Sequence, residues 1–136
     1  MMSVRFLPSL ALMVVAAFGL VGCGDSAKTF FPTWSPSGDP VPTGALQGRL
    51  VERNGCLLWA DEREYLPIWP EPYELDGATI LVDSRPVIRV GDTAFLGGGM
   101  RSLGGVESLI GEQVPQRCQA AGGYWLVTRV EWDLGG

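Results

Sequence analysis

The chain has 136 residues, with 10 Lys and Arg against 15 Asp and Glu, and a formal net charge of −5. This acidic balance argues against a nucleic-acid partner, because binding nucleic acid requires concentrated positive charge. The chain contains no His, which excludes any catalytic triad, dyad or zinc site that depends on imidazole.

The first 22 residues have the pattern of a secretory signal peptide. Arg5 provides a charged start, and residues 6–21 are almost wholly apolar. A transmembrane helix needs about 20 apolar residues, whereas this run is shorter and is interrupted by Pro8 and Ser9. We therefore expect residues 1–22 to be an export signal. A retained single-span anchor is the alternative.

The apolar run ends in Leu20, Val21, Gly22 and Cys23, which resembles the lipobox of bacterial lipoproteins. In that pattern the Cys is acylated and becomes the mature N-terminus. The resemblance implies an exported protein held at the cell membrane or outer membrane by acyl chains on Cys23, since two or more chains give stable anchoring. The alternative is a Cys that merely ends a signal peptide cleaved elsewhere. Arg5 is the only charge in residues 1–22, so the remainder carries −6 and would be repelled by anionic lipid.

Residues 23–44 have the composition of a flexible linker. They contain prolines at positions 32, 36, 40 and 42 among Ser, Thr, Gly and Asp, which favours an extended chain without a core of its own. Three aromatic residues are unusual in such a spacer: Phe30, Phe31 and Trp34. We interpret them as a local patch against the domain or the membrane interface, with a docking motif as the alternative.

Residues 45–134 form the expected folded domain. Short apolar runs are broken by turn residues at intervals of about eight to twelve positions, which is typical of all-β barrels and sandwiches. We predict a small, single-domain antiparallel barrel, OB-like or similar. Asn54-Gly55 is a strong signal for a two-residue hairpin turn between strands at 46–52 and 56–60, and this turn places Leu50 opposite Trp59 and Val51 opposite Leu58.

The middle of the domain predicts further strands. A strand at 65–69 contains Pro67 and is followed by Pro70, which confines it to an edge or an irregular segment because proline cannot donate to a ladder. Apolar runs at 78–83, 87–90 and 93–96 are separated by turn residues, and they predict a meander of adjacent antiparallel strands.

The last part of the domain begins with Gly97-Gly98-Gly99, which predicts a glycine-rich connection that continues through Gly104-Gly105. One helical turn is expected at 107–110. The final strand is expected at 124–132, because its residues alternate in type. The alternation places on one face Tyr124, Leu126, Thr128, Val130 and Trp132.

Two cysteines remain once Cys23 is assigned to lipid. Cys56 and Cys118 are an even pair in an oxidising compartment, and a disulfide is the natural interpretation. The alternative, two thiols at a redox or metal site, lacks a Cys-x-x-Cys motif and an adjacent His. We expect no metal and no cofactor.

A group of short motifs resembles the small β-barrel domains of uncharacterised exported bacterial lipoproteins over about residues 45–130. The motifs are Asn54-Gly55-Cys56-Leu57, Leu66-Pro67-Ile68-Trp69-Pro70, Val90-Gly91-Asp92 with the three glycines, and Pro115 and Cys118 followed by residues 123–127. The resemblance supports the fold and the disulfide, and it implies no particular activity.

Two groups of residues are candidates for function. Trp59, Trp69 and Trp125 are candidate ligand contacts, because exposed aromatic faces stack on sugars and OB-folds bind oligosaccharides, although packing in the core is the favoured interpretation. The acidic residues between positions 62 and 76 provide the paired carboxylates that glycoside hydrolysis uses, although a solvated acidic loop is favoured. These residues are Glu62, Glu64, Glu71, Glu74 and Asp76.

We expect a membrane-anchored, non-catalytic binding or interaction module, with an envelope protein or glycan as its partner. A glycan-processing hydrolase using the acidic residues of 62–76 is the alternative. A structural lipoprotein without a small ligand is the third option.

Overall fold

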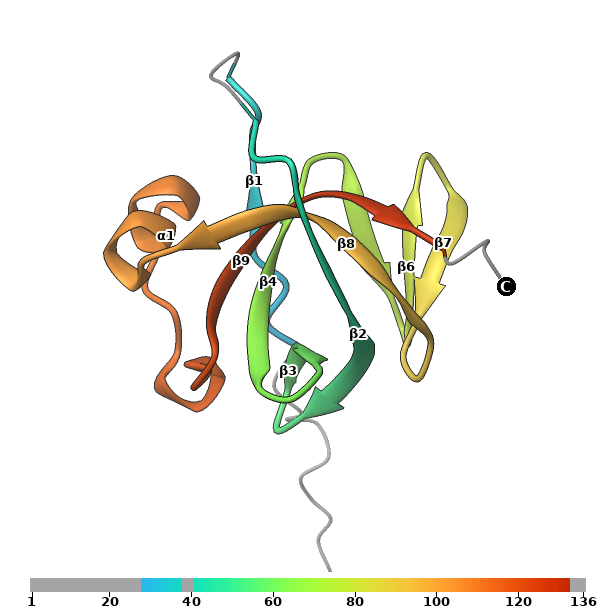
Figure 1. The fold of residues 1–136 in the computed structure, drawn as a ribbon, viewed down its shortest axis with the longest axis horizontal. Helices are drawn as coiled ribbons and strands as arrows, with labels where there is room; N and C mark the ends of the chain where they lie inside the picture. Colours follow the sequence, from blue (N-terminus) through green and yellow to red (C-terminus); the bar gives the residue numbers. More distant parts are fainter. Residues whose placement is uncertain (1–27, 38–40, 133–136) are drawn as a thin grey trace, which may run out of the picture.

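The computed structural model describes residues 28–37 and 41–132. This part of the chain is built mostly of strands, with one α-helix and one 3-10 turn (Figure 1). In chain order the elements are β1 (Thr33–Trp34), β2 (Gly44–Arg53), β3 (Cys56–Ala60), β4 (Glu64–Pro70), β5 (Tyr73–Asp76), β6 (Thr79–Val82), β7 (Arg85–Arg89), β8 (Thr93–Arg101), α1 (Leu103–Ile110), η2 (Gln116–Cys118) and β9 (Gly123–Glu131). The all-β prediction is confirmed.

Five strands form a closed ring. The main sheet has the order β1-β4-β3-β2-β8-β9, and β9 also pairs with β4. β4 and β9 run parallel, as do β1 and β4, whereas the other neighbours are antiparallel. The ring is antiparallel except where β4 meets β9, because five strands cannot alternate in direction all the way around a ring. Its assignment as OB-like stays a prediction.

The Asn54-Gly55 hairpin forms in the expected register. Leu50 pairs with Trp59 and Val51 with Leu58. Asn54 and Gly55 have φ of 56° and 76°, the positive values that a type I′ turn requires at both central positions.

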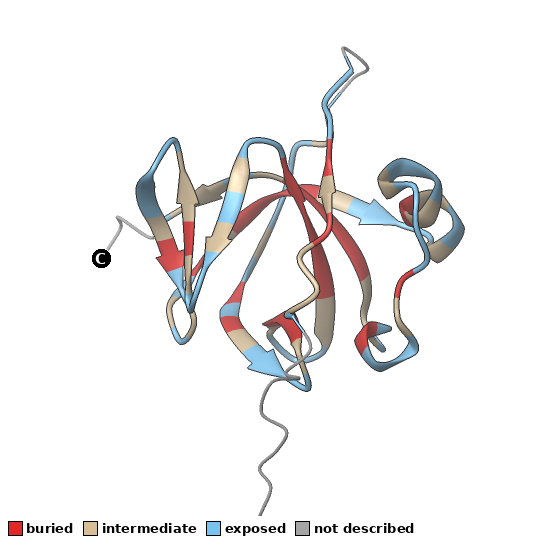
Figure 2. Cartoon of the chain, turned by 180° about the vertical axis from the view of Figure 1, so that it is seen from behind, coloured by how far each residue is buried: buried red, intermediate tan, exposed pale blue. Residues whose placement is uncertain are grey.

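Alternate residues of the ring enter two separate cores. The inner core receives buried side chains from all five ring strands, so it fills the ring. It consists of Leu50, Leu57, Trp59, Trp69, Ile80, Ile88, Ala94, Leu96, Trp125 and Val127. The outer core covers β3, β4 and β9 from outside and includes Trp34, Val106, Val114 and Cys118. Figure 2 shows buried residues running along these strands. Apolar side chains therefore occupy both faces of the first hairpin.

β4 is a central strand and not the expected edge. It pairs with β3 at Glu64 and Tyr65, with β9 from Tyr65 to Ile68, and with β1 at Trp69 and Pro70. The amide of Trp69 donates to Pro32 O at 2.9 Å. Successive amides of a strand point to opposite sides, so the nitrogen of Pro67 lies on the same side of β4 as those of Tyr65 and Trp69. On this side the partner of β4 changes from β3, which pairs as far as Tyr65, to β1, which pairs from Trp69 onward. A proline is tolerated there because no ladder bond is lost.

The meander contains different strands from those expected. β5, β6 and β7 form a separate three-stranded sheet, which lies on the side of the ring opposite α1 (Figure 1). β8 does not pair with β7, and instead joins β2 and β9 within the ring. β5 was not expected as a strand, because Tyr73–Asp76 follows two prolines and has mostly polar residues.

Gly97, Gly98 and Gly99 lie inside β8, so the prediction of a connecting loop there is wrong. Gly98 has φ of 147°, and a Cβ at this position would lie 1.8 Å from Leu126 O. The pairing register shifts here, from Gly97–Arg129 to Gly98–Val127, which leaves Thr128 as an extra residue of β9. This bulge is why the expected alternation fails: Tyr124 and Leu126 face the outer core, whereas Val130 packs against the inner one.

Candidate functional site

The lipobox residues Leu20 to Cys23 lie outside the described residues, and their role stays a prediction. Within residues 28–37 and 41–132, no helix is both long and apolar enough to cross a membrane.

The segment that precedes β2 is part of the folded domain, which corrects the linker prediction for residues 28–37. Phe30 N donates to Gly55 O at 2.8 Å, and Thr29 Oγ1 donates to Glu52 at 3.0 Å. Phe31 stacks on Trp69 with a ring-centroid distance of 5.8 Å. We call residues 28–37 the strap, because they run along β4 from the hairpin to the opposite end of the ring. The local-patch interpretation of the aromatic residues is confirmed.

Trp34 fastens the far end of the strap. It is 8 % exposed, and its Nε1 donates to Val127 O at 3.0 Å. β1 pairs with β4 through Thr33–Trp69 and Trp34–Pro70. An aromatic residue in a proline-rich spacer was the sequence signal for this contact, but the composition of its neighbours suggested a linker.

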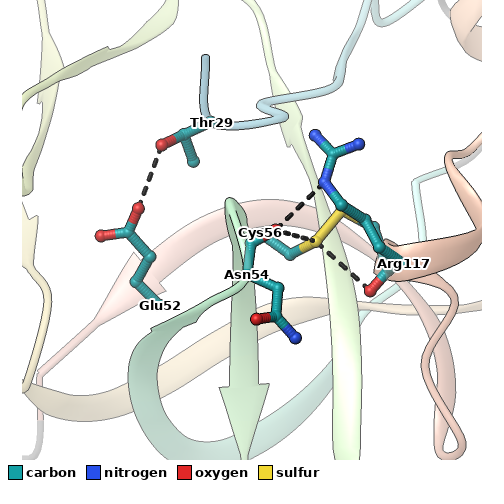
Figure 3. Close-up of a disulfide and its surroundings, with 6 residues drawn as sticks. Thr29, Glu52, Asn54, Cys56 and Arg117 are labelled. Atoms are coloured by element: carbon teal, nitrogen blue, oxygen red, sulfur yellow. Dashed lines mark hydrogen bonds between the residues drawn. A yellow bond between two sulfur atoms is a disulfide. The ribbon is translucent and has the colours of Figure 1, made fainter. Parts of the chain in front are cut away.

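Cys56 and Cys118 form a disulfide that joins β3 to η2 (Figure 3). The Cα atoms are 5.5 Å apart, and both residues are buried. Arg117 extends over the hairpin, and its Nε donates to Asn54 O at 3.0 Å. No group of three or more potential metal ligands occurs among the residues that the structure describes. The structural role is therefore the better supported of the two interpretations of this cysteine pair.

The three candidate ligand-contact tryptophans are buried. Trp59 and Trp69 are 0 % exposed and Trp125 is 8 % exposed. Trp59 lies over Gly48, where a Cβ would be 2.5 Å from its Nε1, and it donates to Leu46 O at 3.0 Å. These side chains fill the ring and present no stacking face to a sugar. Packing in the core, the favoured interpretation, describes them correctly.

The acidic residues of 62–76 do not meet in a cleft. Glu64 forms an ion pair with Arg53 at the start of β4, whereas Glu71 follows the end of β4 and accepts a bond from Ser35 Oγ at 2.6 Å. The length of the strand separates them by about 20 Å, more than twice the distance that paired glycosidase carboxylates use. Glu62, Glu74 and Asp76 are exposed.

A groove lies where the strap meets α1 and the end of β8. Its volume is about 290 Å³. Trp34 and Leu126 are buried and form its floor. Val41 and Leu109, 49 % and 44 % exposed, are among its walls. Arg101 is the one charged residue among the described residues that line it. The remaining lining residues are Ser35, Pro36, Ser37, Pro42 and Gly105.

The position of α1 beside this groove has a local cause. Ser102 caps the helix by accepting from Gly105 N at 3.0 Å, and Gly111 ends it in the left-handed conformation. Val106 is buried in the outer core, whereas Leu109 points to the groove. Glu107 is turned away, because its carboxylate accepts from Val114 N at 2.8 Å. The helix therefore presents an apolar wall to the groove. This wall was not predicted from the sequence, because only one helical turn was expected at 107–110, whereas α1 spans Leu103–Ile110.

Two tyrosines have raised pKa values. Burial raises the pKa of Tyr73, although a hydrogen bond with the Val130 backbone opposes the shift. Burial likewise raises the pKa of Tyr124, with the nearby Glu107 carboxylate adding to the shift and a hydrogen bond with the Ala120 backbone opposing it. Both tyrosines are packed against the cores, so their shifts reflect packing. Neither lines the groove.

Comparisons with known proteins give no relative: no family model matches the chain, and neither curated proteins nor solved structures show significant similarity. The candidate site is therefore defined by its own geometry, which is the groove between the strap, the end of β8 and α1.

Proposed function

We propose that the chain is a bacterial membrane lipoprotein whose β domain stands outside the cytoplasm and acts as a non-catalytic binding module. The observation that carries this proposal is the sequence Leu20-Val21-Gly22-Cys23 at the end of the apolar run. The paired cysteines Cys56 and Cys118 support export, because disulfides persist in oxidising compartments.

The strap supports a defined orientation at the membrane. Only a short stretch separates Cys23 from Thr29, where the domain begins its contacts with the first hairpin. An extended chain spans at most about 3.5 Å per residue, so this stretch reaches at most about 20 Å. The hairpin end of the ring therefore lies near the bilayer, whereas the strap runs to β1 at the opposite end (Figure 1). The groove lies beside β1, because Trp34 of this strand lines it.

The groove favours binding over catalysis. Its described lining combines apolar walls with one guanidinium and two serines, a combination that recognises a ligand but supplies no general base. The acidic residues of the hydrolase alternative are spread over β4, the connections on either side of it, and β5. The partner we propose is an envelope protein or glycan that approaches the membrane-distal end.

Fractionation of a bacterial host that expresses the full chain tests this proposal. We expect the wild-type chain in the membrane fraction, and we expect Cys23→Ser to lose membrane association. Acid-trapped extracts of the wild type should contain no alkylatable thiol at Cys56 or Cys118. Free thiols at these positions, or equal membrane association of both chains, would contradict the proposal.

A further inference from the structure

We propose that the groove binds an extended peptide segment that carries a carboxylate next to an apolar side chain, with the carboxylate paired to Arg101. This inference rests on the proposed function of the domain as a binding module, and it names the class of partner.

The charge of the groove lining favours an anionic partner. The exported part of the chain has a net charge of −6, yet the described lining of the groove contains a guanidinium and no carboxylate. Glu107 on the adjacent helix is held by Val114 N, and Glu71 behind the Ser35 rim is held by the Ser35 hydroxyl. Arg101 is exposed, and its Nη1 donates a hydrogen bond to the carbonyl oxygen of the neighbouring Met100 at 3.0 Å. It is therefore accessible to an anionic partner.

The end of β8 has no paired strand on its β2 side among the described residues. On one side, β8 pairs with β9 as far as Arg101–Tyr124, whereas on the other its pairing with β2 ends at Gly98–Gly44. Beyond Gly98, the neighbour on the β2 side is Pro42, whose ring lies against Gly99. A proline has no amide to donate. The end of β8 thus presents main-chain groups at an edge, and such edges accept an added strand.

The unpaired edge of β8 favours a peptide over an acyl chain as the occupant of the groove. Apolar walls of Val41 and Leu109 suit either ligand, and both have a carboxylate for Arg101. However, an acyl chain has no groups that pair with the main chain of β8 beyond Gly98, whereas an extended peptide has them at alternate residues. The groove is also small, about 290 Å³. This volume suits one or two apolar side chains next to a paired strand.

Selection from a displayed library of random seven-residue peptides tests the proposal. The bait is the full lipidated chain in detergent. We expect the enriched peptides to share an Asp or Glu within two positions of a Leu, Ile, Val or Phe. An enriched peptide is then synthesised, and its affinity is measured by fluorescence anisotropy together with that of a matched peptide in which the acid is replaced by its amide.

The variants locate the binding. Arg101→Gln should lower the affinity for the enriched peptide by about tenfold or more, the value of one charge-assisted pair. This variant should bind the acid peptide and the matched amide peptide with equal affinity. Leu109→Asp should lower the affinity for the enriched peptide to a similar extent. Arg129→Gln is the matched control, because Arg129 is an exposed cation of β9 paired with Glu131 and lies outside the groove lining. It should leave the affinity unchanged.

Enrichment without acidic residues, or no enrichment at all, would overturn the inference. Equal affinity for wild type and Arg101→Gln would do the same. Tight binding of palmitate that displaces the peptide would assign the groove to an acyl chain instead. These results leave the anchoring proposal intact, because fractionation of Cys23→Ser tests it independently.

Discussion

The indole Nε1 of Trp34 donates a hydrogen bond to the carbonyl oxygen of Val127, at a distance of 3.0 Å. Ninety-three positions separate the two residues, and both are buried. This bond joins the strap to the closing strand of the ring at the floor of the groove. It makes the N-terminal segment a structural part of the domain and connects the proposed anchor to the proposed binding site.

Replacing Trp34 with Phe removes this donor while keeping an aromatic ring. We expect the free energy of unfolding to fall by about 1–3 kcal/mol, the cost of leaving a buried polar group without its partner. Urea denaturation followed by circular dichroism measures the loss. Trp132→Phe is the control, because Trp132 is 43 % exposed and should change stability little. Equal losses of stability in the two variants would contradict a stabilising role of the hydrogen bond from Trp34 to Val127.

Gly98→Ala is expected to be the most damaging single methyl addition in β8. The new Cβ would lie 1.8 Å from Leu126 O, at a φ of 147° that L residues rarely adopt. Backbone atoms must move to relieve such a contact, so we expect a loss of at least about 3 kcal/mol. Gly104→Ala is the matched control in α1, where no atom lies within 4 Å of the added carbon. It should be neutral or stabilise by up to about 1 kcal/mol.

The disulfide is expected to account for a large share of stability. Cys56 and Cys118 close a loop with a sequence separation of 62, which corresponds to about 4 kcal/mol in the chain-entropy model. Adding reductant to the wild-type chain should lower the urea midpoint to that of a Cys56→Ser, Cys118→Ser double variant. The double variant itself should not respond to reductant. An unchanged midpoint of the reduced wild type would contradict this expectation.

Alkaline pH should destabilise the domain through the half-buried Tyr73. The raised pKa of Tyr73 means that the folded state holds the phenol proton more tightly than the unfolded chain. Stability is therefore complete below the ordinary tyrosine pKa of about 10 and falls as pH rises through the folded value. Tyr73→Phe should flatten this decline in urea midpoints measured from pH 8 to 11. A steeper decline in the variant would refute the assignment.

Local signals in the sequence predicted local structure correctly. Asn54-Gly55 determined a turn type and hence a register, so both cross-strand pairs of the first hairpin follow from two residues. The cysteine pair was predicted by counting, because one of three cysteines was assigned to lipid. These features depend on neighbours in the chain or on covalent chemistry, and they did not require knowledge of the topology.

Features that depend on distant contacts were not predicted. Gly97 to Gly99 were predicted as a loop, because the close approach that requires a glycine at position 98 comes from Leu126, on another strand. Pro67 read as an edge signal because the change of partner along β4 depends on the strap. The groove was not predicted for the same reason: its walls come from the strap, from Val41 and Pro42, from β8 and from α1, and only the closed ring brings them together.

We propose that Cys23 carries the acyl chains that hold this domain at a membrane. Metabolic labelling of a bacterial host with an alkynyl fatty acid, followed by mass spectrometry of the purified full chain, tests it most directly. We predict label on the wild type and on the Cys56→Ser, Cys118→Ser double variant, an N-terminus that begins at Cys23, and no label on Cys23→Ser. Label on Cys23→Ser, or an unlabelled wild type that retains residues 1–22, would contradict the claim.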